Sequence, residues 1–335
     1  MWIGFIMLAV SLAVILLSCE LFTNGIEWLG KKLKVGDGVV GSIFSAVGTC
    51  LPETMIPIIA ILFSNHGANS VDVGIGAIVG APFMLSTLAF FISGISVLIF
   101  WKRRKTGLNM LVNNKILSRD IGFFIIVYSI GVAAALIHSA VIRPFVAVFL
   151  IAYYIYYIIL TVKQDHVSHG ELETLYITKM IKAKPNMAVI LFQVLLALAG
   201  IVLGAELFVE NLEKVSEVFG ISALVLSLII TPIATELPEK FNSVIWISKK
   251  KDTLALGNIT GAMVFQSCIP VAIGILATSW ELDIKAIVSA VLSIASALVT
   301  YSWIKIKGNL NPIPLVFGGV FYATFILFLV SRNFQ

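Results

Sequence analysis

The sequence predicts an all-α membrane protein whose ten transmembrane helices form two inverted five-helix repeats. Three observations lead to this fold class: an apolar composition, the spacing of long apolar segments, and a phrase that recurs in the second half. Of 335 residues, 59% are hydrophobic and 12% are charged, and the mean hydropathy is +1.03. A water-soluble domain would expose too much apolar surface with this composition, so we expect the chain to cross a bilayer many times.

Ten apolar segments are long enough to cross the hydrocarbon core of a membrane. They lie near residues 3–23, 39–63, 73–100, 121–138, 144–162, 188–212, 222–247, 254–277, 284–303 and 312–331. The second, third, seventh and eighth contain Gly, Pro or Glu in their middles, which predicts broken helices, whereas the others are expected to be scaffold. The first segment has no basic residue before it and no small-residue cleavage site, which favours a retained span over a signal peptide.

Positive charge is concentrated in alternate loops. Opposite the N-terminal side, the loops hold eighteen basic residues: Lys31, Lys32, Lys34, Lys102, Arg103, Arg104, Lys105, Lys115, Arg119, Lys163, Lys179, Lys182, Lys184, Lys249, Lys250, Lys251, Lys305 and Lys307. The N-terminal side holds four: Arg143, Lys214, Lys285 and Arg332. By the positive-inside rule, both termini are expected outside the cytoplasm. We interpret the run 102–105 as a topology signal beside anionic lipid, not as a nucleic-acid site.

The two halves of the chain align with each other. A shift of 186 residues pairs Glu20-Leu-Phe22 with Glu206-Leu-Phe208, Glu27 with Glu213, and Thr49-Cys-Leu-Pro-Glu53 with Thr235-Glu-Leu-Pro-Glu239. After a five-residue difference in the next loop, Gly76 and Gly80 align with Gly257 and Gly261. Each half holds five spans, and because an odd number of crossings ends on the other side, the second half must be inverted, as in many secondary transporters.

This alignment predicts three parts of the chain. Residues 1–163 form the first five-helix repeat, with its motif at about 39–100. Residues 164–186 form a cytoplasmic linker, and residues 187–335 form the inverted second repeat, with its motif at about 222–277.

A carboxylate beside a helix-breaking proline is costly inside a membrane, and the sequence places one in each half. Pro52 and Pro238 lack an amide hydrogen, which is expected to free backbone carbonyls about one turn earlier. Together with hydroxyls and carboxylates, these carbonyls predict an oxygen-rich cage at the midplane, formed by Thr49, Thr235, Glu53 and Glu239. Calcium accepts such oxygen ligands in flexible geometry, whereas zinc or copper would favour His or Cys.

The motifs resemble those of a known superfamily. GTCLPE (48–53) with GIGAIVGA (74–81), and ATELPE (234–239) with LGNITGA (256–262), look like the two alpha-repeats of the calcium/cation antiporters, a group that includes sodium/calcium and proton/calcium exchangers. The resemblance extends over nearly the whole chain. It implies a central calcium ligated by Glu53 and Glu239, with Thr49 and Thr235 as carbonyl or hydroxyl donors. It also implies alternating access by sliding of the first and sixth spans.

Several positions depart from the sodium/calcium exchanger pattern. Sodium/calcium exchangers commonly have Ser after the motif Thr, and a Gly-Ser-Asn phrase followed by Asn or Asp in the third and eighth spans. This chain has other residues at these positions: Cys50, Glu236, Ala81, Ala262, Pro82, Met263, Leu85 and Gln266. The loss of sodium ligands leaves both sodium and protons as possible coupling ions. Glu236 adds a carboxylate near the predicted cage, and three carboxylates around one divalent ion would favour protonation of one of them. Gln266 and Asn258 can each donate a carbonyl oxygen toward the ion or bridge two helices, and Gln266 has the better position in the family pattern.

The sequence therefore predicts a secondary antiporter, and not an enzyme, that exchanges calcium for sodium or protons and extrudes calcium across a prokaryotic plasma membrane. Its partners are these ions and the lipid bilayer, while the oligomeric state stays open. No cofactor or nucleic acid is expected, and ATP is not implied because nothing resembles a nucleotide-binding loop. Alternatives are an antiporter for another cation pair or a cation channel. An intramembrane enzyme ranks last because the spans lack a paired aspartate or a Ser/His arrangement.

Overall fold

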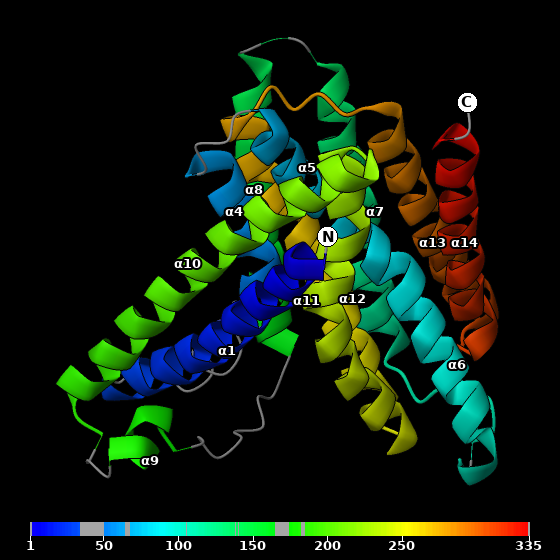
Figure 1. Ribbon diagram of the computed structural model, residues 1–335. Coiled ribbons are helices and arrows are strands. Elements are labelled where there is room, and N and C mark those ends of the chain that lie inside the picture. The colour runs from blue at the N-terminus through cyan, green and yellow to red at the C-terminus, as the bar shows by residue number, and fades with distance from the viewer. Residues whose placement is uncertain are drawn as a thin grey trace.

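The structure, a computed structural model, describes residues 2–33, 50–63, 68–104, 106–137, 139, 141–164, 174–181 and 185–333. Within its helices, the description omits the side chains of residues 2, 3, 68, 162–164, 180, 181, 237–242, 332 and 333. The helices are α1 (Trp2–Lys32), α4 (Leu51–Leu62), α5 (Ala68–Met84), α6 (Phe90–Phe100), α7 (Asn114–Ala133), α8 (Ile142–Gln164), α9 (Tyr176–Ile181), α10 (Met187–Phe219), α11 (Ala223–Ser248), α12 (Asp252–Ala277), α13 (Ile284–Lys307) and α14 (Pro312–Asn333) (Figure 1).

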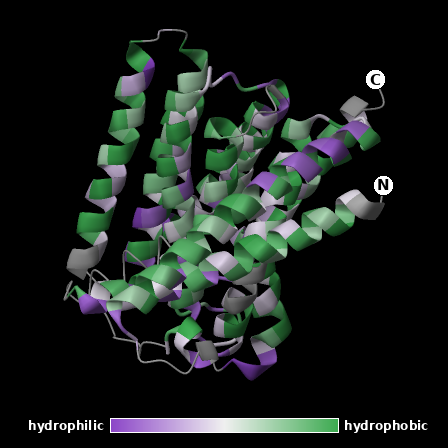
Figure 2. Ribbon diagram, turned by 60° about the vertical axis from the view of Figure 1, so that its left-hand side comes forward, coloured by the Kyte–Doolittle hydropathy of each residue, from purple (hydrophilic) through white to green (hydrophobic). Residues whose placement is uncertain are grey.

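The helices agree with the predicted apolar segments. Each of the ten segments contains a described helix, while residues 39–49 of the second segment and residue 138 at the end of the fourth lie outside the described residues. Eight helices in the described part are long and apolar enough to span a bilayer, while residues 51–62 and 223–236 form shorter apolar stretches. Most residues of the helices are hydrophobic, as the green colour of the ribbon shows (Figure 2). The chain is therefore an all-helical, multi-pass integral membrane protein.

The expected breaks in the helices are only partly present. In the third segment, a π-helical turn at Leu85–Ala89 separates α5 from α6, and α4 carries Pro52 in its first turn, where an amide hydrogen is not needed. The breaks predicted for the seventh and eighth segments are wrong, because α11 and α12 each continue as one helix through their prolines. A single proline removes one backbone donor, and a long packed helix can accommodate that loss with a bend.

Helices α5 and α11 pack closely against each other in the middle of the molecule. A Cβ atom added to Gly80 would lie 2.8 Å from Pro232 Cγ, and one added to Gly76 would lie 3.0 Å from Ser227 Cβ. The Ser227 hydroxyl donates to the Val73 carbonyl at 2.7 Å, which joins the same two helices. Helix packing thus accounts for both glycines of the first repeat.

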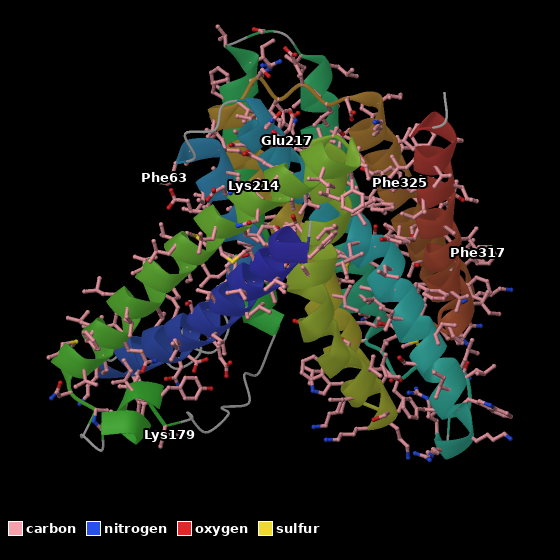
Figure 3. All side chains as sticks on the ribbon, in the orientation of Figure 1. Phe63, Lys179, Lys214, Glu217, Phe317 and Phe325 are labelled. Carbon is pink, nitrogen blue, oxygen red and sulfur yellow. The ribbon has the colours of Figure 1, made fainter. Side chains whose placement is uncertain are left out.

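Helices α1 and α10 form a pair that packs along its length. In Figure 1 this pair diverges from α11 and α12 toward the end of the molecule that carries α9. We call this end the lysine-rich end, because it holds the loop lysines that follow α1, α11 and α13. The opposite end is called the outer end. Figure 3 shows Lys179 at the lysine-rich end, and Lys214 and Glu217 toward the outer end.

Candidate functional site

The helices that carry the repeated motifs pack against one another. Each of α4, α5, α11 and α12 contacts the other three. The fold therefore brings the first motif, on α4 and α5, next to the second motif, on α11 and α12. This is the arrangement that an ion site shared between two halves requires.

Glu53 lies in the first turn of α4 and is 3% exposed. The amide groups at the start of a helix carry partial positive charge, which stabilises an ionised carboxylate at this position. The preceding Cys50 carbonyl accepts hydrogen bonds from Thr54 N at 3.2 Å and from Thr54 Oγ1 at 2.6 Å. This carbonyl is therefore engaged within α4. The predicted ligand Thr49 lies outside the described residues.

The second motif places a hydroxyl and a carboxylate in the interior. Thr235 and Glu236 are 0% and 1% exposed, respectively. The Thr235 hydroxyl donates to the Thr231 carbonyl at 3.0 Å, which leaves lone pairs on its oxygen for a cation. Glu239 lies on the same helix, and its side chain is outside the described residues.

Gln266 is the most distinctive polar side chain of α12. It is 0% exposed, and neither its Oε1 nor its Nε2 atom has a hydrogen-bond partner among the described residues. Burying an amide without partners costs free energy, so such a group usually has a ligand, water or functional role. The sequence predicted this residue as a carbonyl donor, and its burial agrees with that role.

The complete calcium cage stays a prediction. The described residues contain no group of three or more His, Cys, Asp or Glu side chains that could hold a metal ion. Two of the predicted ligands, Thr49 and the side chain of Glu239, are outside the description. The structure thus places Glu53, Thr235, Glu236 and Gln266 in the interior of the contacting helices.

A buried ion pair contradicts our interpretation of one loop charge. Arg104 was expected beside anionic lipid as part of the run 102–105, but its side chain and that of Asp252 are both 0% exposed, and the two form a bidentate pair. Asp252 also accepts from Leu111 N at 2.7 Å, and Arg104 donates to the Ile247 carbonyl at 3.0 Å. This pair fixes the loop after α6 against the turn between α11 and α12. Sequence spacing gave no signal for it.

A second polar cluster was also missed from the sequence. Asp120 of α7 is 2% exposed and accepts from Arg119 Nη2 at 2.8 Å and from Thr260 Oγ1 at 3.2 Å. Arg119 also donates to Thr161 Oγ1 of α8 at 3.1 Å. The cluster ties α7, α8 and α12 together. Arg119 had been counted as a loop charge because it precedes the predicted apolar segment.

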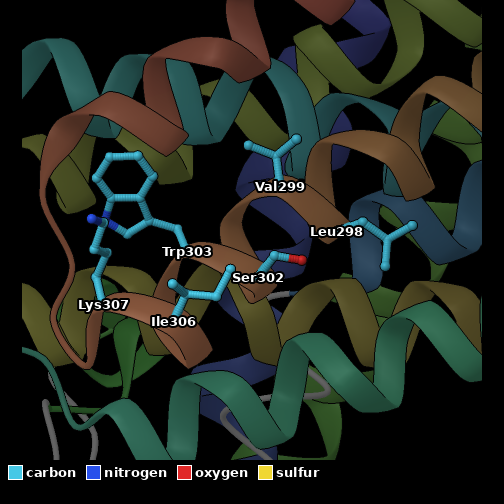
Figure 4. Close-up of a pocket in the computed structure, with 6 residues that line it drawn as sticks. All are labelled: Leu298, Val299, Ser302, Trp303, Ile306 and Lys307. Atoms are coloured by element: carbon cyan, nitrogen blue, oxygen red, sulfur yellow. The ribbon is translucent and has the colours of Figure 1, made fainter.

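The groove shown in Figure 4 does not belong to the candidate site. Its volume is about 390 Å³, and all six lining residues, from Leu298 to Lys307, come from α13. None of the predicted ligands lines this groove, which is a depression on the surface of α13.

The fold and the buried oxygen-bearing side chains define a class of protein: a multi-pass membrane transporter with charged groups inside its helix bundle. The sequence matches the family described as "Sodium/calcium exchanger protein" over residues 3–163 and 189–333, and the chain therefore belongs to that family. It is a member of the calcium/cation antiporter superfamily.

Individual membrane proteins are also similar to this chain in sequence or in structure. The membrane protein MJ0091 of Methanocaldococcus jannaschii is 25% identical over 298 residues, which cover 89% of this chain and 88% of that protein. The structure of the H⁺/Ca²⁺ exchanger CAX superposes with a TM-score of 0.71 and 17% identity, covering 98% of this chain and 82% of that one. A structure of the sodium–calcium exchanger NCX_Mj gives a TM-score of 0.57 with 20% identity, covering 97% and 98%. At these identities, the structural likeness shows the fold.

Proposed function

We propose that this cation antiporter exchanges calcium for sodium or protons and extrudes calcium from the cytoplasm. The observation that carries the proposal is the amide of Gln266, which has no hydrogen-bond partner among the described residues and is buried in a helix that contacts those of Glu53 and Glu236. Oxygen ligands of this kind suit calcium, and carboxylates can bind calcium or protons alternately. Competition between the two ions for the same oxygens would couple their movements.

The ligand set in this proposal contains Glu53, Glu239, Thr49, Thr235, Glu236 and Gln266. Glu53 and Glu239 carry the charge of calcium, and the other oxygens complete its shell. Glu236 supplies the additional carboxylate that makes protons a serious coupling ion. The relatives support both options, since one similar structure is of an H⁺/Ca²⁺ exchanger and another is of a sodium–calcium exchanger.

The proposal also includes the architecture predicted from the repeats. Ten spans form two inverted halves, and both termini face away from the cytoplasm of a prokaryotic cell. The eighteen loop lysines and arginines on one side support this orientation. Inverted halves allow one central site to face each side of the membrane in turn.

Radioactive calcium uptake into proteoliposomes tests the function. We expect uptake under a sodium gradient or under a pH gradient, and the gradient that drives it identifies the coupling ion. Glu53→Gln and Glu239→Gln should each lower uptake at least tenfold, because each removes one of the charges that bind calcium. Glu210→Gln is the matched control, since Glu210 is partly exposed and pairs with Lys214 on the same helix.

Uptake under neither gradient, or uptake unchanged in both site variants, contradicts the proposal. Flux that does not saturate would indicate a channel.

A further inference from the structure

Helices α1 and α10, with the linker helix α9, are packed and hydrogen-bonded together and are expected to move as one rigid body. A Cβ atom added to Gly204 of α10 would lie 2.9 Å from Ile15 Cγ1, and one added to Gly25 of α1 would lie 2.8 Å from Val194 Cγ2. These contacts let the two helices approach closely along their length. The unit therefore resists separation of its own helices.

Buried amide groups attach α9 to this pair. Gln193 of α10 is 0% exposed, and its Nε2 donates to the Leu21 carbonyl at 2.8 Å and to Asn24 Oδ1 at 2.9 Å, both on α1. Its Oε1 accepts from Ile177 N of α9 at 3.0 Å. One side chain thus joins three helices. We call α1 and α10, together with the attached α9, the α1/α10 unit.

The α1/α10 unit contacts the remaining helices mainly near the outer end. Most buried apolar residues of the described part fall into two separate clusters, and the smaller one contains residues of α1 and α10 together with parts of α4, α5 and α11. Its members from α10 include Val209, Leu212 and Val215, which pack near Ile56 and other residues of these helices. At the lysine-rich end, the unit diverges from α11 and α12 (Figure 1).

A carboxylate lies within this outer contact. Glu213 of α10 is 8% exposed, and its Oε1 accepts a hydrogen bond of 2.6 Å from Ser70 Oγ of α5, which is 1% exposed. A hydrogen bond to a carboxylate in apolar surroundings is stronger than one between neutral groups in water. The bond cannot persist if α10 moves away from α5.

We infer that the Ser70–Glu213 hydrogen bond holds the outer end of the antiporter closed and must break before that end opens. Glu213 is then a positioning residue that sets the balance between the two orientations of the carrier. It is not a calcium ligand. The inference rests on the alternating-access transport proposed above, and it adds a residue pair that determines how readily the carrier changes orientation.

The sequence repeat extends the inference to the lysine-rich end. Glu27 aligns with Glu213, and the shift that pairs Gly76 with Gly257 places Lys251 opposite Ser70. The two residues have equivalent positions, since Lys251 precedes the first turn of α12 and Ser70 lies in the first turn of α5. Lys251 is exposed, whereas Ser70 is buried. When the α1/α10 unit closes the lysine-rich end, Glu27 and Lys251 would approach, and their opposite charges would stabilise that state.

Distance measurements between spin labels test the outer contact. Nitroxides at the exposed residues Leu191 of α10 and Ile245 of α11 report the separation at the lysine-rich end. The background replaces the cysteines Cys19, Cys50 and Cys268 with alanine. We expect Ser70→Ala to raise the ratio of short to long distances roughly tenfold, the order expected for losing a hydrogen bond to a charged group. Glu213→Gln should shift the ratio in the same direction by a smaller factor.

Matched controls separate this effect from a general disturbance of α10. Ser216→Ala removes a buried hydroxyl whose hydrogen bond among the described residues goes to the Glu213 carbonyl within its own helix, and it should leave the distances unchanged. Unchanged distances in both Ser70→Ala and Glu213→Gln, or an equal shift in Ser216→Ala, would overturn the inference. Calcium binding separates the two proposals. Glu53→Gln should lose binding, whereas Ser70→Ala should keep binding and change only the exchange rate.

A charge swap tests the contact predicted for the lysine-rich end. Glu27→Lys and Lys251→Glu should each lower the ratio of short to long distances several-fold, because each replaces attraction by repulsion. The double variant should restore most of the original ratio, since it re-creates an opposite-charge pair. A double variant that shows only the combined losses of the single variants would overturn this half of the inference.

Discussion

At the scale of single residues, Gln266 offers the sharpest distinction between a functional and a structural role. Gln266→Leu keeps a similar volume and removes an amide that has no hydrogen-bond partner among the described residues. Replacing such a group by an apolar one should leave thermal stability unchanged or raise it, because the desolvation cost disappears. If the amide oxygen binds calcium, transport should fall about tenfold or more. Unfolding temperature and calcium uptake, measured on the same preparation, check both expectations.

Gln193→Leu is the matched comparison for that prediction. Gln193 is also 0% exposed, but its amide forms three hydrogen bonds that join α1, α9 and α10. Its loss should cost stability, by about 1–3 kcal/mol for each buried partner that stays unsatisfied. A destabilised Gln266→Leu protein with normal transport would contradict the role proposed for Gln266.

The burial of the candidate site residues could be predicted from the sequence better than their contacts. Glu53, Thr235 and Gln266 were chosen from a duplicated phrase and a family position, and all three are buried. By contrast, the pairing of Ser70 with Glu213 depends on how α10 lies against α5, across 143 residues of chain. No local pattern specifies a distant partner of this kind, so the contact could not be predicted.

At the scale of helices and loops, the Arg104–Asp252 pair sets the geometry of the lysine-rich end. Asp252→Ala would leave the Arg104 guanidinium buried without its carboxylate and would also remove the acceptor of Leu111 N. Loss of one partner of a buried ion pair typically costs 3–5 kcal/mol, because the remaining charge is uncompensated. We therefore expect a clear decrease in the apparent unfolding temperature in detergent.

Two further variants calibrate that measurement. The double variant Arg104→Met with Asp252→Leu should retain more stability than Asp252→Ala, since it buries no isolated charge. Glu210→Ala breaks a pair whose side chains are 60% and 37% exposed, and it should cost about 0.5 kcal/mol or less. Equal unfolding temperatures for Asp252→Ala and Glu210→Ala would show that the buried pair does not stabilise the fold.

Apolar length predicted the helices well, whereas local composition predicted their breaks poorly. The ten apolar segments all contain helices, because a membrane leaves the backbone few other ways to satisfy its hydrogen bonds. Proline and glycine give only a tendency to break. In α11, the packing of neighbouring helices holds one continuous helix of 26 residues. The π-helical turn at Leu85–Ala89 has no proline of its own, although Pro82 precedes it by one turn.

At the scale of the whole molecule, the lysine-rich end predicts the orientation of the protein in its membrane. The basic residues gather where α9 and the ends of α1, α11 and α13 lie, and the positive-inside rule assigns that end to the cytoplasm. The orientation determines which end of the ion pathway opens to the cytoplasm. It also decides whether the Ser70–Glu213 hydrogen bond faces the cell exterior.

Reporter fusions can measure this orientation directly. Alkaline phosphatase, which is active only outside the cytoplasm of a bacterial cell, should be active when fused after Gln335 and inactive when inserted in the 164–186 linker. Green fluorescent protein should show the reverse pattern, because it folds poorly when exported through the general secretion pathway. Replacing the linker and loop lysines with glutamine should reduce the bias, since lysine and arginine determine topology. A fluorescent C-terminal fusion with an active phosphatase in the linker would contradict the predicted orientation and place the lysine-rich end outside the cytoplasm.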